Sequence, residues 1–281
     1  MDRAHLLVID PQNDFCDLPT DWCPPDPIGA GRLAPALAVT GAHQDMLRLA
    51  TWVDEHREKI DRVTVTMDHH HRLDIAHPGF WRSADGTAVG PFTLVLAADV
   101  AEGRILTAKP QDRDRALKYL QDLEKAGRFT HMVWPVHCQI GTWGQAVHAR
   151  LQQALDAWAD LKGAGVTTVL KGENPWTEHY SAIRAEIPLD TDPATGWNWE
   201  LVRNLEKAKI VYVAGEAGSH CVRATVEHLV EAGLDPEKIV LLEDAISPVT
   251  GFEAAQTAFF QAMADKGMRI LKLEQAAGLL E

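Results

Sequence analysis

The chain has 281 residues, of which 46% are hydrophobic and 24% are charged, a composition typical of a globular protein with a large core. Asp and Glu outnumber Lys and Arg by 40 to 27, so the formal charge is -13. Such an acidic chain repels polyanions, which argues against nucleic acid or a membrane surface as a partner. The apolar run at residues 6–9 is too short for a signal peptide or a membrane-spanning helix, and we expect a cytoplasmic protein.

Short β-branched runs alternate with helical patterns along the chain. Strands are predicted at residues 5–9, 63–67, 131–134, 166–170, 209–213, 239–242 and 268–273. Amphipathic helices are predicted at residues 44–57, 142–158 and 221–232. This alternation indicates a mostly parallel sheet covered on both faces, in a single α/β domain that spans residues 1–281.

Two stretches interrupt this rhythm. Residues 82–130 include the charged segment QDRDRALKYLQDLEKAG, which predicts a solvated surface helix, and residues 185–200 are predicted to be a loop. We interpret both as insertions that could cover a ligand site or contact another subunit. We therefore expect a homo-oligomer.

Chemically capable side chains follow the carboxyl ends of the predicted strands, which is the edge where open parallel sheets bind ligands. Any one of these residues is explained as readily by packing, capping or surface exposure, so the inference depends on their joint placement. In chain order they are Asp10, Asp68, His70, His137, Lys171 and Cys221.

Cys221 is predicted to lie where a buried strand turns into a helix. A cysteine attacks as its thiolate, and the free N–H groups in the first turn of a helix favour that form. Lys171 would add positive charge, and Asp10 could accept the thiol proton and later return it. Gly215 and Gly218 would let backbone N–H groups turn inward as an oxyanion hole. These residues together predict a cysteine hydrolase.

A second group of residues suits a metal ion. Asp68 and His70 lie two residues apart after a strand and should point to the same side, and His137 could complete a facial set of ligands. Oxygen and nitrogen ligands with open coordination positions suit Zn²⁺, Fe²⁺ or Mn²⁺. The chain has 13 histidines, so one histidine alone would be weak evidence.

Several segments, in this order along the chain, together resemble the nicotinamidase branch of the isochorismatase-like cysteine hydrolases. They are VIDPQNDF (8–15), LAVTGA (37–42), TMDHH (66–70), WPVHCQIGTWGQAVH (134–148), LKGENP (170–175) with YSAI (180–183), GEAGSHCV (215–222) and LLEDA (241–245). The resemblance implies a three-layer α/β/α fold around a six-stranded, mostly parallel sheet. It also implies a triad of Asp10, Lys171 and Cys221, a cis peptide bond before Ala217, and an oxyanion hole made by the N–H groups of Ala217 and Cys221.

The same resemblance implies a ligand site for one divalent metal ion, which takes the pyridine nitrogen of the substrate. Its implied ligands are Asp68, His70 and His137. Phe15 and Trp134 match the ring-stacking positions of the family, and Tyr180 is expected to line the same pocket.

The implied activity is hydrolysis of nicotinamide or a related small amide to the acid and ammonia through a cysteine thioester. A metal-free hydrolase of the same fold, acting on another amide, a ureido or a carbamoyl compound, is one alternative. A non-catalytic binding module that kept the fold is the other. The sequence departs from the family pattern in two places. The region after Asp68 is longer than in compact members of the family, so that Asp74 and His77 lie farther along the chain from Asp68. The other is Glu216, which would need a partner if it is buried.

Overall fold

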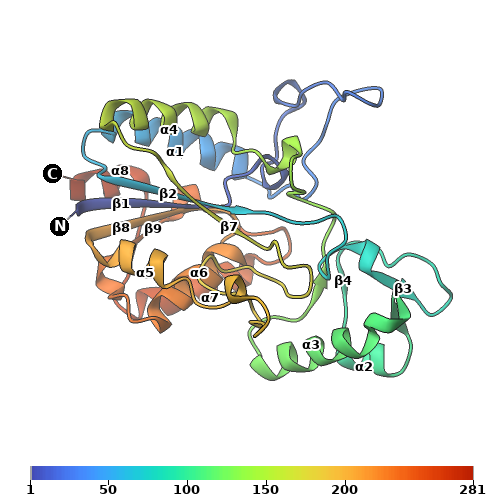
Figure 1. Ribbon diagram of the computed structural model, residues 1–281. Coiled ribbons are helices and arrows are strands. Elements are labelled where there is room, and N and C mark those ends of the chain that lie inside the picture. The colour runs from blue at the N-terminus through green and yellow to red at the C-terminus, as the bar shows by residue number, and fades with distance from the viewer. Residues whose placement is uncertain (1, 281) are drawn as a thin grey trace.

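The computed structural model describes residues 2–280 and shows a central sheet between two layers of helices (Figure 1). Six strands lie in the order β10-β9-β8-β1-β2-β7, and every neighbouring pair is parallel. Their bounds are β1 (Asp2–Ile9), β2 (Arg62–Asp68), β7 (Thr167–Lys171), β8 (Ala208–Gly215), β9 (Ile239–Leu242) and β10 (Arg269–Leu271). The three-layer α/β/α fold expected from the sequence is confirmed.

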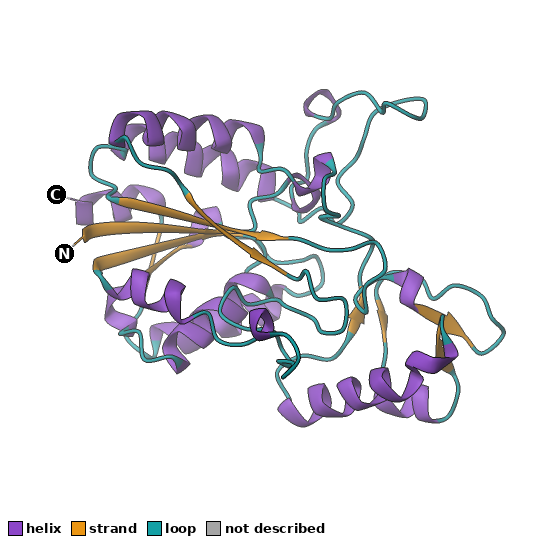
Figure 2. Ribbon diagram, in the orientation of Figure 1, coloured by secondary structure: helices purple, strands orange, loops and turns teal. Residues whose placement is uncertain are grey.

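Helices cover both faces of the sheet, as Figure 2 shows. On one face lie α1 (Ala42–His56), α4 (Ala149–Lys162) and α8 (Leu273–Ala277), and on the other lie α5 (Trp199–Glu206), α6 (Cys221–Glu231) and α7 (Glu253–Ala264). Leu6, Leu7, Val8 and Ile9 of β1 are fully buried, which explains why the sequence there is continuously apolar rather than alternating. Within residues 2–280, no helix has the length and apolar character needed to cross a membrane.

The strand predicted at residues 131–134 does not join this sheet. β6 (Met132–Val133) pairs instead with β4 (Thr93–Leu94) in a separate antiparallel ribbon. β7 lies beside one edge of β2 and β1 lies beside the other. Because both edges of β2 are taken, the segment before His137 has no place next to it, and His137 reaches the site from a loop.

The insertion at residues 82–130 forms a lobe together with the residues just before it. It contains β3 (Trp81–Ser83), β5 (Ile105–Thr107), α2 (Ala97–Ala101) and α3 (Arg113–Ala126). The charged helix predicted to be solvated is α3, and one of its faces is buried in a hydrophobic cluster separate from the main core. That face consists of Ala116, Tyr119, Leu120 and Leu123, each at most 5% exposed. The prediction of a solvated helix therefore holds only for the opposite face.

The predicted loop at residues 185–200 is shorter than expected. It is irregular apart from short turns, one of which is a 3-10 turn at Pro193–Thr195. α5 begins at Trp199 and so takes the last two residues of the predicted loop.

The carboxyl ends of β1 and β8 approach closely because residue 215 is a glycine. Gly215 has a φ of 112°, and a Cβ at this position would lie 1.9 Å from the carbonyl oxygen of Ile9. The N–H of Glu216 donates to the same carbonyl at 2.7 Å. No residue with a side chain fits at position 215, beside the carbonyl of Ile9. This close approach of the two paired strands places Asp10 next to the turn that leads to Cys221.

Candidate active site

Asp10, Lys171 and Cys221 come together at the carboxyl ends of β1, β7 and β8. Lys171 Nζ lies 2.8 Å from Asp10 Oδ2 and 3.6 Å from Cys221 Sγ. A carboxylate oxygen of Asp10 lies within 4.8 Å of the sulfur, and so does one of Asp68. All of these residues are at most 6% exposed. The predicted convergence of an acid, an amine and a thiol at one edge of the sheet is confirmed.

Lys171 is held in its charged form by the carboxylates around it. Its Nζ contacts Asp68 as well as Asp10, and donates to the carbonyl of His179 at 3.1 Å. Burial opposes the charge, but Asp10 and Asp68 raise the pKa of Lys171 well above its ordinary value. Burial also opposes ionisation of Asp68, yet Lys171 and the neighbouring histidines lower the pKa of that carboxyl. One buried ammonium group thus serves two buried carboxylates.

The thiol of Cys221 carries its proton in this environment. Burial raises the pKa of Cys221 well above its ordinary value, and Asp10 adds to this effect while Lys171 opposes it. Lys171 does favour the thiolate, as expected, but burial is the larger effect and the pKa of Cys221 is raised on balance. The contribution of the first turn of α6 stays a prediction. Burial raises the pKa of Asp10 too, again opposed by Lys171. The hydroxyl of Thr66 donates to Asp10 Oδ1 at 2.6 Å and fixes the carboxylate beside the sulfur.

The turn between β8 and α6 presents two free backbone donors. The Glu216–Ala217 peptide bond is cis, as the resemblance implied. The N–H groups of Ala217 and Cys221 donate no hydrogen bond within residues 2–280, whereas the N–H of Gly218 donates to the carbonyl of Ser247 at 2.9 Å. Free N–H groups beside a nucleophile can hold the oxygen of a carbonyl under attack.

Glu216 is fully buried behind this turn, and its partner is Asp45 of α1. The two buried carboxyl groups lie close enough to shift each other's pKa, and Glu216 Oε1 has no other hydrogen-bond partner among the described residues. The backbone N–H of Ser247 donates to Glu216 Oε2 at 3.1 Å, and the Ser247 hydroxyl donates to Asp45 Oδ2 at 2.5 Å. Burial, together with the charge of Asp45, raises the pKa of Glu216 well above its ordinary value. Glu216 therefore keeps its proton beside Asp45, which also contacts Arg48 and the hydroxyl of Ser247.

Asp68, His70 and His137 each place one ligand atom within 4.8 Å of the other two. His70 Nε2 lies 3.7 Å from Asp68 Oδ1, and His137 Nε2 lies 3.8 Å from Asp68 Oδ2, which is too long for a direct hydrogen bond. The Nδ1 atoms are engaged elsewhere, that of His70 with Asp74 at 3.1 Å and that of His137 with the carbonyl of Pro135 at 2.8 Å. Outer partners of this kind orient histidines for metal binding, so the donor set fits a divalent cation.

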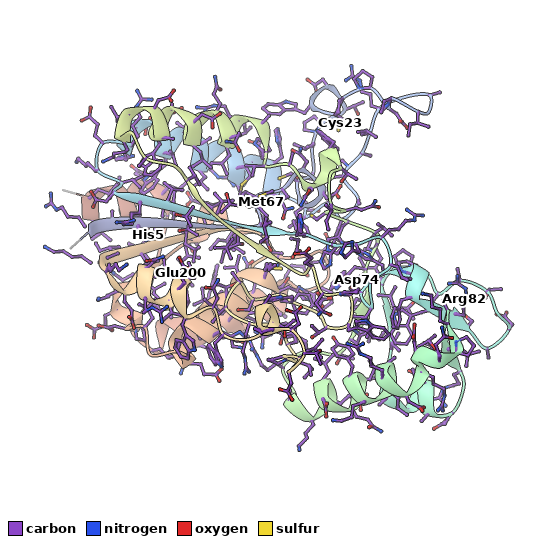
Figure 3. All side chains as sticks on the ribbon, viewed as in Figure 1. His5, Cys23, Met67, Asp74, Arg82 and Glu200 are labelled. Atoms are coloured by element: carbon purple, nitrogen blue, oxygen red, sulfur yellow. The ribbon has the colours of Figure 1, made fainter. Side chains whose placement is uncertain are left out.

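Three buried residues complete this cluster and were not predicted as site residues. Asp74, labelled in Figure 3, lies where the sheet meets the lobe, four residues after His70. The ring of His77 lies 5.2 Å from those of both His70 and His137. Glu178 Oε2 has no hydrogen-bond partner among the described residues, and burial raises the pKa of Glu178 to about 7. These residues lie in loops rather than at strand ends, and only the density of Asp and His in one loop could have indicated the first two.

The predicted ring-stacking residues fall into two groups. Phe15 packs against His137, with ring centroids 5.4 Å apart. Trp134 Nε1 donates to the Tyr180 hydroxyl at 3.0 Å, and both rings pack against His220, at 5.2 and 5.3 Å. His220, which was not among the predicted site residues, directly precedes α6. Stacking of a substrate ring between Phe15 and Trp134 stays a prediction.

No protein-family profile matches the sequence, and no curated protein is significantly similar to it in sequence. In structure, the chain is similar to a nicotinamidase/pyrazinamidase from Acinetobacter baumanii, with a TM-score of 0.63 and 19% identity over 98% of this chain and 99% of that chain. It is similar to yeast nicotinamidase, with a TM-score of 0.61 and 19% identity over 95% of this chain and 99% of that chain. It is also similar to a Pyrococcus horikoshii pyrazinamidase in complex with zinc, with a TM-score of 0.55 and 18% identity over 96% and 99% of the two chains. The chain therefore has the fold of the nicotinamidases and pyrazinamidases, as its sequence segments implied.

Proposed function

We propose that this chain is a cysteine amidohydrolase of the nicotinamidase type, which hydrolyses nicotinamide or a related small amide to the acid and ammonia. The observation that carries the proposal is the position of Lys171 Nζ between the carboxylate of Asp10 and the sulfur of Cys221, beside two free backbone donors. The similarity of nearly the whole chain to nicotinamidases and pyrazinamidases supports the same assignment.

The protonated thiol of Cys221 needs a base, and we assign this role to Asp10, one of the two carboxylates within 4.8 Å of the sulfur. Asp10 accepts the proton as the sulfur attacks the amide carbon, and the N–H groups of Ala217 and Cys221 hold the oxygen that becomes negative. Lys171 stays charged and stabilises the thiolate as it forms. When the tetrahedral intermediate collapses, Asp10 returns the proton to the leaving nitrogen, ammonia departs and a thioester remains.

Water then completes the turnover. Asp10 takes a proton from the water molecule whose oxygen attacks the thioester carbon, the C–S bond breaks, and Cys221 recovers the proton as the acid leaves. Thr66 keeps Oδ1 of Asp10 hydrogen bonded throughout, so Oδ2, which faces Lys171, is the oxygen that exchanges the proton. Loss of one oxyanion donor typically lowers the rate by about 10²–10³. General acid–base catalysis typically contributes about 10²–10⁴, so the turn and the base contribute comparably.

Asp68, His70 and His137 would hold one divalent ion, Zn²⁺, Fe²⁺ or Mn²⁺. When bound, the ion would supply a Lewis acid that binds a ring nitrogen of the substrate. Asp68 Oδ1 contacts Lys171, whereas Oδ2 faces His137. Asp68 therefore connects the residues that orient the substrate with those that perform the chemistry.

The test is ammonia release from nicotinamide, pyrazinamide and butyramide by the purified protein. Cys221→Ala should abolish turnover but unfold in the same transition as the wild type. Cys23→Ala removes a thiol from the projecting loop in which Cys23 is labelled in Figure 3, and it should keep full activity. Ammonia release at the wild-type rate by Cys221→Ala would contradict the proposal. Turnover of nicotinamide should be lost after treatment with a chelator and return with Zn²⁺, Fe²⁺ or Mn²⁺. Chelator-insensitive turnover of a ureido compound would favour the metal-free alternative.

A further inference from the structure

A pocket of about 290 Å³ lies outside His220. Its lining includes His220 and Arg223 near the start of α6, Arg128 and Phe129 before β6, and Phe252 before α7. The lining contains two arginines and no carboxylate, although the chain as a whole has a formal charge of -13. A positively charged concavity on an acidic protein favours an anionic ligand.

The two arginines of the pocket are only partly neutralised. Glu227 serves both, because its Oε1 accepts from Arg223 Nε at 2.8 Å and its Oε2 accepts from Arg128 Nη2 at 2.9 Å. Glu186 lies 3.9 Å from Arg128, but burial raises the pKa of Glu186 to about 7. His228 also contacts Arg128, and burial lowers the pKa of His228 to about 3, so it is uncharged. Two guanidinium groups thus share the carboxylate of Glu227.

Arg223 in particular has donors to spare. Its two terminal nitrogens make no hydrogen bond within residues 2–280. The guanidinium group lies over the ring of Phe129, with its central carbon 5.2 Å from the ring centroid, and that of Arg128 lies over the same ring at 5.7 Å. The shared ring restricts both side chains, which lowers the entropy cost of binding an anion between them.

His220 connects this pocket to the nucleophile. On the pocket side its ring stacks on Phe129, with centroids 5.8 Å apart. Its other ring neighbours are Trp134 and Tyr180, the residues expected to line the substrate site, and the next residue in the chain is Cys221. His220 therefore lies between the lining of the pocket and the residues expected to line the substrate site.

We propose that this arginine-lined pocket binds a carboxylate carried by the substrate, so that the preferred substrates are small amides with a carboxylate at the end opposite the scissile bond. The inference rests on the proposed amidohydrolase function and names its substrate class. The terminal nitrogens of Arg223 match the two oxygens of a carboxylate in a bidentate contact. Neutral nicotinamide fills the site at Cys221 and leaves the pocket unused.

The test compares substrates that differ only in this group. Succinamate and butyramide form one pair, and a nicotinamide with a ring carboxylate and nicotinamide itself form the other. The wild type should have the higher kcat/KM for the anionic member, mainly through KM. Arg223→Gln should lower kcat/KM for the anionic member at least about tenfold, since a charge-assisted hydrogen bond is removed. Its kcat/KM for the neutral member should stay within about twofold of the wild-type value. Arg203→Gln, on the exposed side of α5, should change neither.

Binding separates this inference from the proposed function. Calorimetric titration of Cys221→Ala with succinamate and butyramide should show the same preference for the anion, and it should be lost in Cys221→Ala/Arg223→Gln. If no amide is hydrolysed but this preference persists, the pocket stands and the amidohydrolase assignment falls. Equal kcat/KM values for the two members of each pair, unaffected by Arg223→Gln, would refute the role of the pocket but not the amidohydrolase function. The same holds if succinamate binds without being hydrolysed while nicotinamide is turned over. Should Arg223→Gln not fold, Arg223→Lys, which removes the bidentate contact but keeps the charge, should still raise KM for the anionic member, and an unchanged KM would also overturn the pocket.

Discussion

Glu216→Gln tests the buried acid pair behind the oxyanion turn. Glutamine has nearly the same shape and keeps an N–H donor for Asp45, but it has no titratable proton. Because folding raises the pKa of Glu216, the folded protein keeps a proton that the unfolded chain releases above the ordinary glutamate pKa of about 4.3. The stabilisation is complete below that ordinary pKa and is lost progressively as the pH rises towards the pKa of the folded state.

The size of the effect follows from one proton. In this window the free energy of unfolding falls by about 1.4 kcal/mol for each pH unit, so between pH 6 and pH 7 the wild type should lose about 1.4 kcal/mol more than Glu216→Gln. The charged groups around Glu216 are Asp45 with its partner Arg48, and Asp17. They are present in both proteins, so the difference between the two slopes reports on the proton of Glu216, whose titration is coupled to that of Asp45.

Urea unfolding followed by tryptophan fluorescence at the two pH values measures these slopes. Glu200→Gln is the matched control, because Glu200 is an exposed residue on α5 (Figure 3) and its loss should leave the wild-type slope unchanged. Identical slopes for the wild type and Glu216→Gln would refute the reasoning, since they would mean that Glu216 is already ionised in the folded protein.

Three further predictions concern the charge cluster around Lys171, the metal ligands and the close approach of β1 and β8 at Gly215. Lys171→Met leaves two buried carboxylates without their ammonium partner and should lower the free energy of unfolding by about 3–5 kcal/mol in urea, and a loss below about 1 kcal/mol would contradict the shared ion pair. Asp74→Asn weakens the outer partner of His70 and should reduce zinc affinity about 10–100-fold in competition with a chromogenic chelator, whereas unchanged affinity would remove Asp74 from the metal site. Gly215→Ala should give little or no folded protein in a thermal melt, whereas Gly90→Ala, whose added Cβ meets open space, should melt like the wild type. A wild-type melt for both variants would show that β1 and β8 tolerate a side chain at position 215.

The sequence alone was enough to predict the architecture and the positions of the chemically active residues. Strands in a covered parallel sheet are continuously apolar, so β1 and β8 could be located from local composition. Parallel strands direct their carboxyl ends to one edge, and therefore Asp10, Lys171 and Cys221 could be expected to meet without any knowledge of their distances. The position of His137 was also predicted near this edge, although for the wrong reason, because the strand before it pairs with β4 and does not join the six-stranded sheet.

Other properties of the site were decided by tertiary structure alone. The proton on Cys221, the choice of Asp45 as the partner of Glu216, and the approach of His77 to the metal ligands all depend on which distant segments pack together. A local pattern records which residue is polar, but the free energy of its charge depends on the water it loses and on the charges it meets after folding. For that reason the sequence could name the reacting groups, whereas their protonation states, and the arginines that set the charge of the pocket outside His220, emerged only from the folded chain.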